Sequence, residues 1–166
     1  MGIKYFCNET LFETWSDKMA YLLGYIYADG SLDDSWYIRA KYLKIVSTDR
    51  ELIEIAKWIL QSKHKIVIIP PQNIKWKTRY LLRIGSHKLF NDLTTIGLYP
   101  NKSLLMTFPK IPDEYLSHFI RGYFDGDGHV SIQLRHGLFK KVSIIFVSGS
   151  KEFLQILAQT LKEKLN

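Results

Sequence analysis

The chain contains one short pattern twice, and this repeat constrains its fold more than any other feature. The two copies are LLGYIYADG at residues 22–30 and IRGYFDGDG at residues 120–128. Each copy is an apolar helical stretch with a central glycine and a small residue four positions later, which places both small residues on one helix face. Two such faces can pack backbone to backbone, so we expect a close helix pair. Its interface residues are Gly24, Ala28, Gly122 and Gly126.

Each copy ends in Asp-Gly, and the helix pair therefore predicts a metal site. If the two helices lie side by side and end at one edge, Asp29 and Asp127 become neighbours. Adjacent carboxylates are unfavourable unless a hard divalent cation joins them, and Mg²⁺ prefers oxygen ligands with several retained waters. Asp29 and Asp127 are therefore the candidate metal ligands.

The two segments resemble the signature of the LAGLIDADG homing endonucleases. In that family the motif helices form the interface between two similar halves, and the last acidic residue of each motif binds catalytic metal. The resemblance implies a catalytic and metal-binding role for Asp29 and Asp127, with Mg²⁺ as cofactor and Mn²⁺ or Ca²⁺ able to replace it in binding. The other acidic position of the motif is Tyr27 in the first copy and Asp125 in the second, so neither is assigned to catalysis.

The resemblance also implies an activity, the site-specific hydrolysis of double-stranded DNA with one phosphodiester cut in each strand. Residues 100–103 look like a stretch in these enzymes where a basic residue lies near the scissile phosphates, which makes Lys102 a candidate catalytic residue. A lysine there can stabilise charge on the phosphate. Two alternatives on the same scaffold stay open, an RNA maturase that assists intron splicing and a non-cleaving DNA-binding regulator. An intron, intein or free-standing origin also stays open.

The repeat extends beyond the motifs and predicts an α+β fold with two pseudo-twofold halves. Residues 46–53 and 147–154 are similar, and each segment follows a strand-like run and opens an amphipathic helix. We expect residues 1–111, connector included, to follow the order helix, strand, strand, helix, strand, strand, helix, with a turn at residues 33–35. Residues 112–166 would form the second half. The implied homing-endonuclease-like architecture presents an antiparallel sheet to DNA.

The basic composition favours a nucleic-acid partner, since the net charge is +7 and the pI is near 9.4. Strand alternation predicts that Arg79 and Arg83 point outward, and that Val130, Ile132 and Leu134 point toward the core. Serine, glutamine and arginine side chains can read base edges when a strand ribbon lies in the major groove. The candidate DNA contacts of the second half are His129, Ser131, Gln133 and Arg135.

The second half is shorter than the first, which predicts an uncovered surface. After its motif helix it has one strand pair and one further helix, so we expect an open sheet edge and a partly exposed apolar face. That face consists of Phe153, Ile156, Leu157 and Leu161. We expect either that the chain is a shortened form of a longer protein or that it associates with another chain. No apolar run approaches a membrane span and the N-terminus lacks a secretory signal, which favours the cytoplasm or an organelle.

Overall fold

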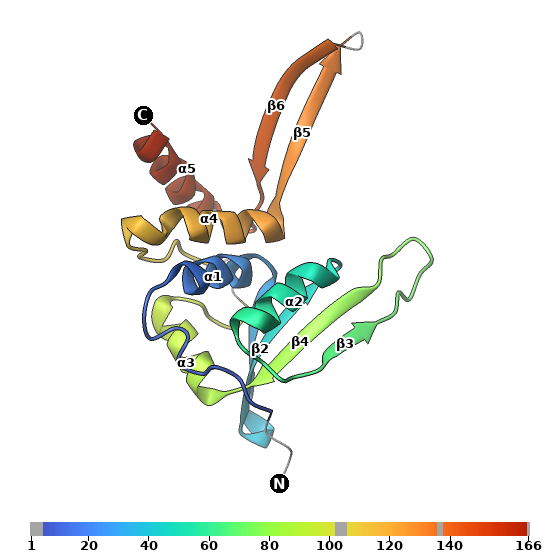
Figure 1. The fold of residues 1–166 in the computed structure, drawn as a ribbon, viewed down its shortest axis with the longest axis vertical. Helices are drawn as coiled ribbons and strands as arrows, with labels where there is room; N and C mark the ends of the chain where they lie inside the picture. Colours follow the sequence, from blue (N-terminus) through green and yellow to red (C-terminus); the bar gives the residue numbers. More distant parts are fainter. Residues whose placement is uncertain (1–4, 102–105, 136–137, 166) are drawn as a thin grey trace.

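Two parallel helices form the centre of the molecule. The structure is a computed structural model that describes residues 5–101, 106–135 and 138–165. Figure 1 shows helix α1 (Asp17–Asp29) and helix α4 (Asp113–Asp127) side by side, with a sheet leading away from each. The Ser16 hydroxyl caps α1 by accepting from the Met19 amide at 3.2 Å, and Gly30 ends it. The predicted helical character of both motif segments is therefore confirmed.

A four-stranded antiparallel sheet follows α1. Its strands are β1 (Gly30–Ser35), β2 (Ala40–Ser47), β3 (Ile66–Ile69) and β4 (Arg79–Gly85), in the spatial order β1-β2-β4-β3. The turn predicted at residues 33–35 is wrong, because these residues belong to β1 and pair with residues 40–42 of β2. The chain turns instead through a short 3-10 helix, Trp36–Ile38, and Arg39, which has a φ of 52°.

Two amphipathic helices, α2 (Arg50–Ile59) and α3 (His87–Ile96), pack with this sheet. The core-facing side chains of β2 and β4 are at most 1% exposed: Leu43, Ile45, Leu82 and Ile84. The predicted outward direction of Arg79 and Arg83 on β4 agrees with their exposure. Within residues 5–101, the predicted order of helices and strands is confirmed.

The second sheet is a hairpin of β5 (Gly128–Arg135) and β6 (Leu138–Phe146), which projects from the end of α4 (Figure 1). The prediction that the apolar side chains of β5 point into a core is wrong. Val130, Ile132 and Leu134 are 54%, 61% and 65% exposed. The physical reason is that a two-stranded ribbon has no interior of its own, and within the described residues no other strand extends this sheet.

Helix α5 (Lys151–Leu165) follows the hairpin, and its apolar face is partly exposed, as predicted. Phe153 and Leu157 are 0% and 3% exposed, so the exposed part of this face does not include them. Phe153 is covered because it packs against Tyr123, with ring centroids 4.7 Å apart, and against Phe108, which precedes α4, at 5.4 Å. Ile156, at 37%, agrees with the prediction. No helix in the described ranges is long and apolar enough to span a membrane.

Candidate functional site

Helices α1 and α4 touch through their backbones. A Cβ atom added to Gly24 would lie 2.0 Å from the carbonyl oxygen of Phe119, and one added to Gly122 would lie 1.9 Å from that of Tyr21. Each carbonyl belongs to the residue three positions before the opposing glycine, so the two contacts are reciprocal. Only glycine fits at these crossing points, because any side chain would overlap with main-chain atoms that cannot move independently.

The register of this contact brings Asp29 and Asp127 to one edge of the helix pair. A Cβ atom on Gly126 would meet the Cβ of Ala28 at 2.4 Å, which fixes the last turns of the two helices side by side. Asp29 and Asp127 are the final residues of α1 and α4, and β1 and β5 begin immediately after them. Two carboxylates thus share an edge with two helix C-termini. The negative ends of the helix dipoles make this edge favourable for a cation.

A tyrosine and a serine lie near each of these aspartates. The Tyr123 hydroxyl donates to the Val147 carbonyl at 2.6 Å. Burial, together with the nearby Asp127 charge, raises the pKa of Tyr123 to about 12, and the Ser148 hydroxyl acts in the opposite direction. In the first half, Tyr25 likewise has an aspartate and a serine near it, Asp29 and Ser47.

Burial raises the pKa of Tyr25, Asp29 raises it further, and Ser47 opposes the rise. The two tyrosines therefore share burial and a neighbouring aspartate but differ in hydrogen bonding, because the buried Tyr25 hydroxyl has no hydrogen-bond partner among the described residues.

The raised pKa values of Tyr25 and Tyr123 predict that the protein loses stability at alkaline pH. Because their folded pKa values exceed the ordinary 10.0, the folded state holds their protons more tightly. Their contribution to the free energy of unfolding is complete below pH 10. It is lost as the pH rises toward the folded pKa, by at most about 1.4 kcal/mol per pH unit for each tyrosine. Denaturant titrations between pH 8 and pH 12 should show a smaller alkaline loss in Tyr123→Phe than in the parent. The exposed-site control Tyr37→Phe should follow the parent, and a Tyr123→Phe curve parallel to the parent would contradict the prediction.

The donor chemistry at Asp29 and Asp127 fits a divalent cation. Mg²⁺ in phosphate chemistry is commonly held by one or two carboxylates, with water and substrate phosphate completing its shell. The described residues contain no group of three or more His, Cys, Asp or Glu side chains that could hold a metal. A cation bound by Asp29 and Asp127 would therefore take its other ligands from water and phosphate.

Other residues of the motifs take part in hydrogen bonding and core packing. The Tyr21 hydroxyl donates to the Asp125 carboxylate at 2.8 Å, which joins α1 to α4. Tyr27 is 1% exposed and packs on Phe119, with ring centroids 5.5 Å apart. Lys102 lies outside the described residues.

The outer face of the four-stranded sheet carries basic side chains. Arg79 and Arg83 are exposed on β4, and Lys44 of β2 is directly paired with Arg83 in the register. The Arg83 guanidinium lies 3.7 Å from the centroid of the Tyr42 ring, and Lys44 forms an ion pair with Asp33. Sequence reasoning missed Lys44, although its position between the buried Leu43 and Ile45 was a signal that it faces outward.

The polar residues of β5 share one strand face, as their alternate positions require. His129 and Gln133 are exposed, and Ser131 is half-buried. Arg135 ends the strand and pairs with Leu138 in the backbone register, but its side chain is outside what the structure describes. The structure thus carries these residues on a hairpin that starts next to Asp127, while Arg79 and Arg83 lie on the other sheet.

Two parallel helices touch through glycines, each helix ends in an aspartate, and an antiparallel sheet begins after each aspartate. These features define a two-motif α+β protein. Comparison with known families identifies it further. Residues 114–166 match the family model described as a LAGLIDADG-like domain. The relationship predicted from the motifs is therefore confirmed for residues 114–166, which form a LAGLIDADG-like domain.

Two curated proteins are similar over most of the chain. One is a "Probable translation initiation factor IF-2" from Thermococcus kodakarensis, which is 31% identical over an alignment of 157 residues that covers 90% of this chain and 12% of that protein. The other has the same description, comes from Methanocaldococcus jannaschii, and is 29% identical over 83% of this chain and 11% of its own length. The chain thus spans about one eighth of the relatives it matches.

Proposed function

We propose that this protein is a site-specific endonuclease that cuts both strands of DNA with the help of a divalent metal. The observation that carries the proposal is the convergence of Asp29 and Asp127 at one edge of the α1–α4 pair. The LAGLIDADG-like match and the exposed basic side chains of the four-stranded sheet support it. A divalent cation at this edge would supply charge stabilisation for phosphodiester hydrolysis.

The residues of the chain would divide the work between chemistry and binding. Asp29 and Asp127 would hold the cation, and Lys102 would offset charge on the phosphate. Arg79, Arg83 and Lys44 would contact the DNA backbone, because Lys and Arg contacts to phosphate orient a protein on the duplex. The residues proposed to read bases are His129, Ser131, Gln133 and Arg135.

The comparisons suggest how such an enzyme would be encoded. The similarity covers only 11% and 12% of the two translation factors. We infer that the shared region is an endonuclease inserted within those longer proteins, as an intein would be, and that its likeness to this chain reflects the insert rather than translation initiation. If so, this chain should cut a duplex carrying the uninterrupted coding sequence around the insertion point and leave the interrupted sequence intact.

If β5 reads bases and β4 contacts phosphates, substitutions on the two strands should affect base preference and overall DNA affinity separately. Gln133→Ala should weaken binding to the selected duplex by about 1–3 kcal/mol and relax the preference at a few base pairs. Arg83→Ala should weaken binding to all sequences alike and reduce the salt dependence, since it would remove a phosphate contact. Binding measured on matched and mismatched duplexes at several salt concentrations distinguishes the two. An unchanged base preference in Gln133→Ala and in Arg135→Ala would contradict the assignment of β5 as the reader.

The experiment that tests the proposed function is cleavage of a randomised duplex library in Mg²⁺ and in EDTA. We expect a defined set of sequences to be cut in both strands in Mg²⁺ and none in EDTA. Selective binding without cutting would instead support the non-cleaving regulator. Preferential binding of structured RNA in a parallel assay would support the maturase.

A further inference from the structure

Tyr25 of α1 has a buried hydroxyl without a hydrogen-bond partner. Its side chain is 1% exposed, and among the described residues no group bonds to the hydroxyl. A phenylalanine would bury the same ring without removing a hydroxyl from water, so the hydroxyl lowers the stability of the folded chain. An unsatisfied buried polar group in a native structure is explained most simply by a ligand or ion that the group serves.

This hydroxyl lies near the edge where α1 and α4 end. The Tyr25 ring lies against the last turn of α4, since a Cβ atom on Gly126 would be 3.4 Å from the ring carbon Cδ2. Gly126 immediately precedes Asp127. The Asp29 charge raises the pKa of Tyr25 and the Ser47 hydroxyl lowers it, so both groups lie close to the Tyr25 hydroxyl. Tyr25 therefore lies at the ends of both helices, beside one candidate metal ligand.

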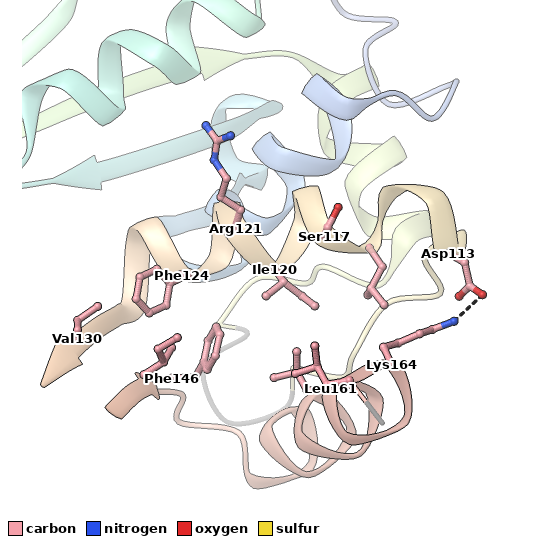
Figure 2. Close-up of a pocket in the computed structure, with 12 residues that line it drawn as sticks. Asp113, Ser117, Ile120, Arg121, Phe124, Val130, Phe146, Leu161 and Lys164 are labelled. Atoms are coloured by element: carbon pink, nitrogen blue, oxygen red, sulfur yellow. Dashed lines mark hydrogen bonds and ion pairs between the residues drawn. The ribbon is translucent and has the colours of Figure 1, made fainter. Parts of the chain in front are cut away.

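Two other tyrosines of this helix pair have hydrogen-bond acceptors. The Tyr21 hydroxyl donates to the Asp125 carboxylate at 2.8 Å, and the Arg121 guanidinium lies 5.1 Å from the centroid of the Tyr21 ring. In Figure 2, which shows an apolar pocket beside α4, Arg121 points toward α1 and away from α5. The Tyr123 hydroxyl donates to the Val147 carbonyl at 2.6 Å. A tyrosine has one hydroxyl proton, so both of these protons are already donated.

The internal repeat makes Tyr25 and Tyr123 equivalent. Each lies one helical turn before the aspartate that ends its helix. The backbone positions also match, because a Cβ atom on Gly122 would be 3.0 Å from the Tyr25 nitrogen and one on Gly24 would be 2.8 Å from the Tyr123 nitrogen. The two positions therefore differ in what the hydroxyl bonds and not in where the backbone lies.

We propose that Tyr25 is a positioning residue for the first metal ligand, and that its hydroxyl donates a hydrogen bond to the Asp29 carboxylate when the cation binds. This inference rests on the proposed metal site and adds a residue to it. A carboxylate is a stronger acceptor than the Ser47 hydroxyl, and carboxylates that bind metals are commonly oriented by hydrogen bonds from neighbouring groups. Tyr123 does not do the same for Asp127, because its proton is donated to a backbone carbonyl.

The binding of Mn²⁺ to the full chain in the absence of DNA tests this role. Water-proton relaxation detects even weak binding of this paramagnetic ion. We expect Tyr25→Phe to weaken Mn²⁺ binding about tenfold, since loss of a group that orients a metal ligand commonly weakens metal binding by that factor or more. Tyr123→Phe removes a hydroxyl from the equivalent position and should change the affinity less than twofold. The Asp29→Asn, Asp127→Asn double variant identifies the binding that belongs to the helix edge.

Denaturant unfolding in EDTA at neutral pH gives a second readout. Tyr25→Phe should have an unfolding midpoint equal to or above that of the parent, because the substitution removes no hydrogen bond and no longer buries a hydroxyl. Tyr123→Phe should have a lower midpoint, because the Val147 carbonyl loses its donor. The variant that keeps its stability is therefore the one expected to lose affinity for the cation.

Three outcomes would overturn the inference. Tyr25→Phe could bind Mn²⁺ as tightly as the parent while the double aspartate variant does not, which would leave the proposed metal site intact. A Tyr25→Phe midpoint as low as that of Tyr123→Phe would show that the hydroxyl has a structural partner in the metal-free protein. Equal Mn²⁺ binding by the parent and the double aspartate variant would overturn the proposed metal site and this inference with it.

Discussion

Replacement of Asp29 or Asp127 by asparagine is expected to slow cleavage of the selected duplex by at least about a hundredfold while leaving DNA affinity nearly unchanged. A neutral amide has the size of a carboxylate but is a poor ligand for Mg²⁺. Each aspartate ends one of two helices whose last turns lie side by side, so removal of either charge should weaken the same cation site. Single-turnover cleavage and equilibrium binding on one duplex measure the two effects separately.

The matched control for this prediction is Asp125→Asn. Asp125 lies two residues from Asp127 on the same helix, but its carboxylate accepts a hydrogen bond from the Tyr21 hydroxyl at 2.8 Å. The substitution keeps an oxygen acceptor for Tyr21, so cleavage should remain within about threefold of the parent rate. Cutting at the parent rate by the Asp29→Asn, Asp127→Asn double variant would contradict the metal assignment. A large loss in the control would mean that any charge change near the helix ends has the same effect.

The second large effect concerns the helix crossing. Gly122→Ala should lower the free energy of unfolding by at least about 3 kcal/mol, because its Cβ atom would lie 1.9 Å from the Tyr21 carbonyl oxygen and the two backbones would have to separate. Helix propensity acts in the opposite direction and favours alanine over glycine by about 1 kcal/mol. A net loss in denaturant unfolding therefore reports the close contact and not a local helix effect.

Gly85→Ala serves as the control for the crossing. Its new Cβ atom would meet only the ring of Tyr42, at 3.2 Å, and this ring can shift slightly. We expect a change below about 1 kcal/mol. If Gly122→Ala and Gly24→Ala were both as stable as Gly85→Ala, the account of α1 and α4 as helices in backbone contact would be contradicted.

The elements predictable from sequence were those governed by local rules. Ser16 has a hydroxyl that caps a helix, Gly97 ends α3 with a φ of 114°, and the alternation in β4 separates the buried Leu82 from the exposed Arg83. The strand at Asp33 and Asp34 was mistaken for a turn because both residues are typical of turns. In the structure, pairing with β2 and the ion pair from Lys44 to Asp33 accommodate these residues in a strand.

Burial in the second half could not be predicted from alternation alone. The pattern of Val130, Ile132 and Leu134 identifies one apolar strand face, and these residues do share a face. Alternation does not say whether anything covers that face, because cover depends on elements distant in the sequence. The same limit applies to Phe153, which is buried by aromatic contacts with Tyr123 and Phe108.

Diffraction data from crystals of the chain with its selected duplex, grown with Mn²⁺ in place of Mg²⁺, test the central claim most directly. The anomalous signal of manganese locates the cation independently of the protein density. The account predicts an anomalous peak at the shared edge of α1 and α4, about 2 Å from carboxylate oxygens of both Asp29 and Asp127 and next to a DNA phosphate. A DNA-bound structure with manganese only at other residues, or with none at this edge, would contradict it.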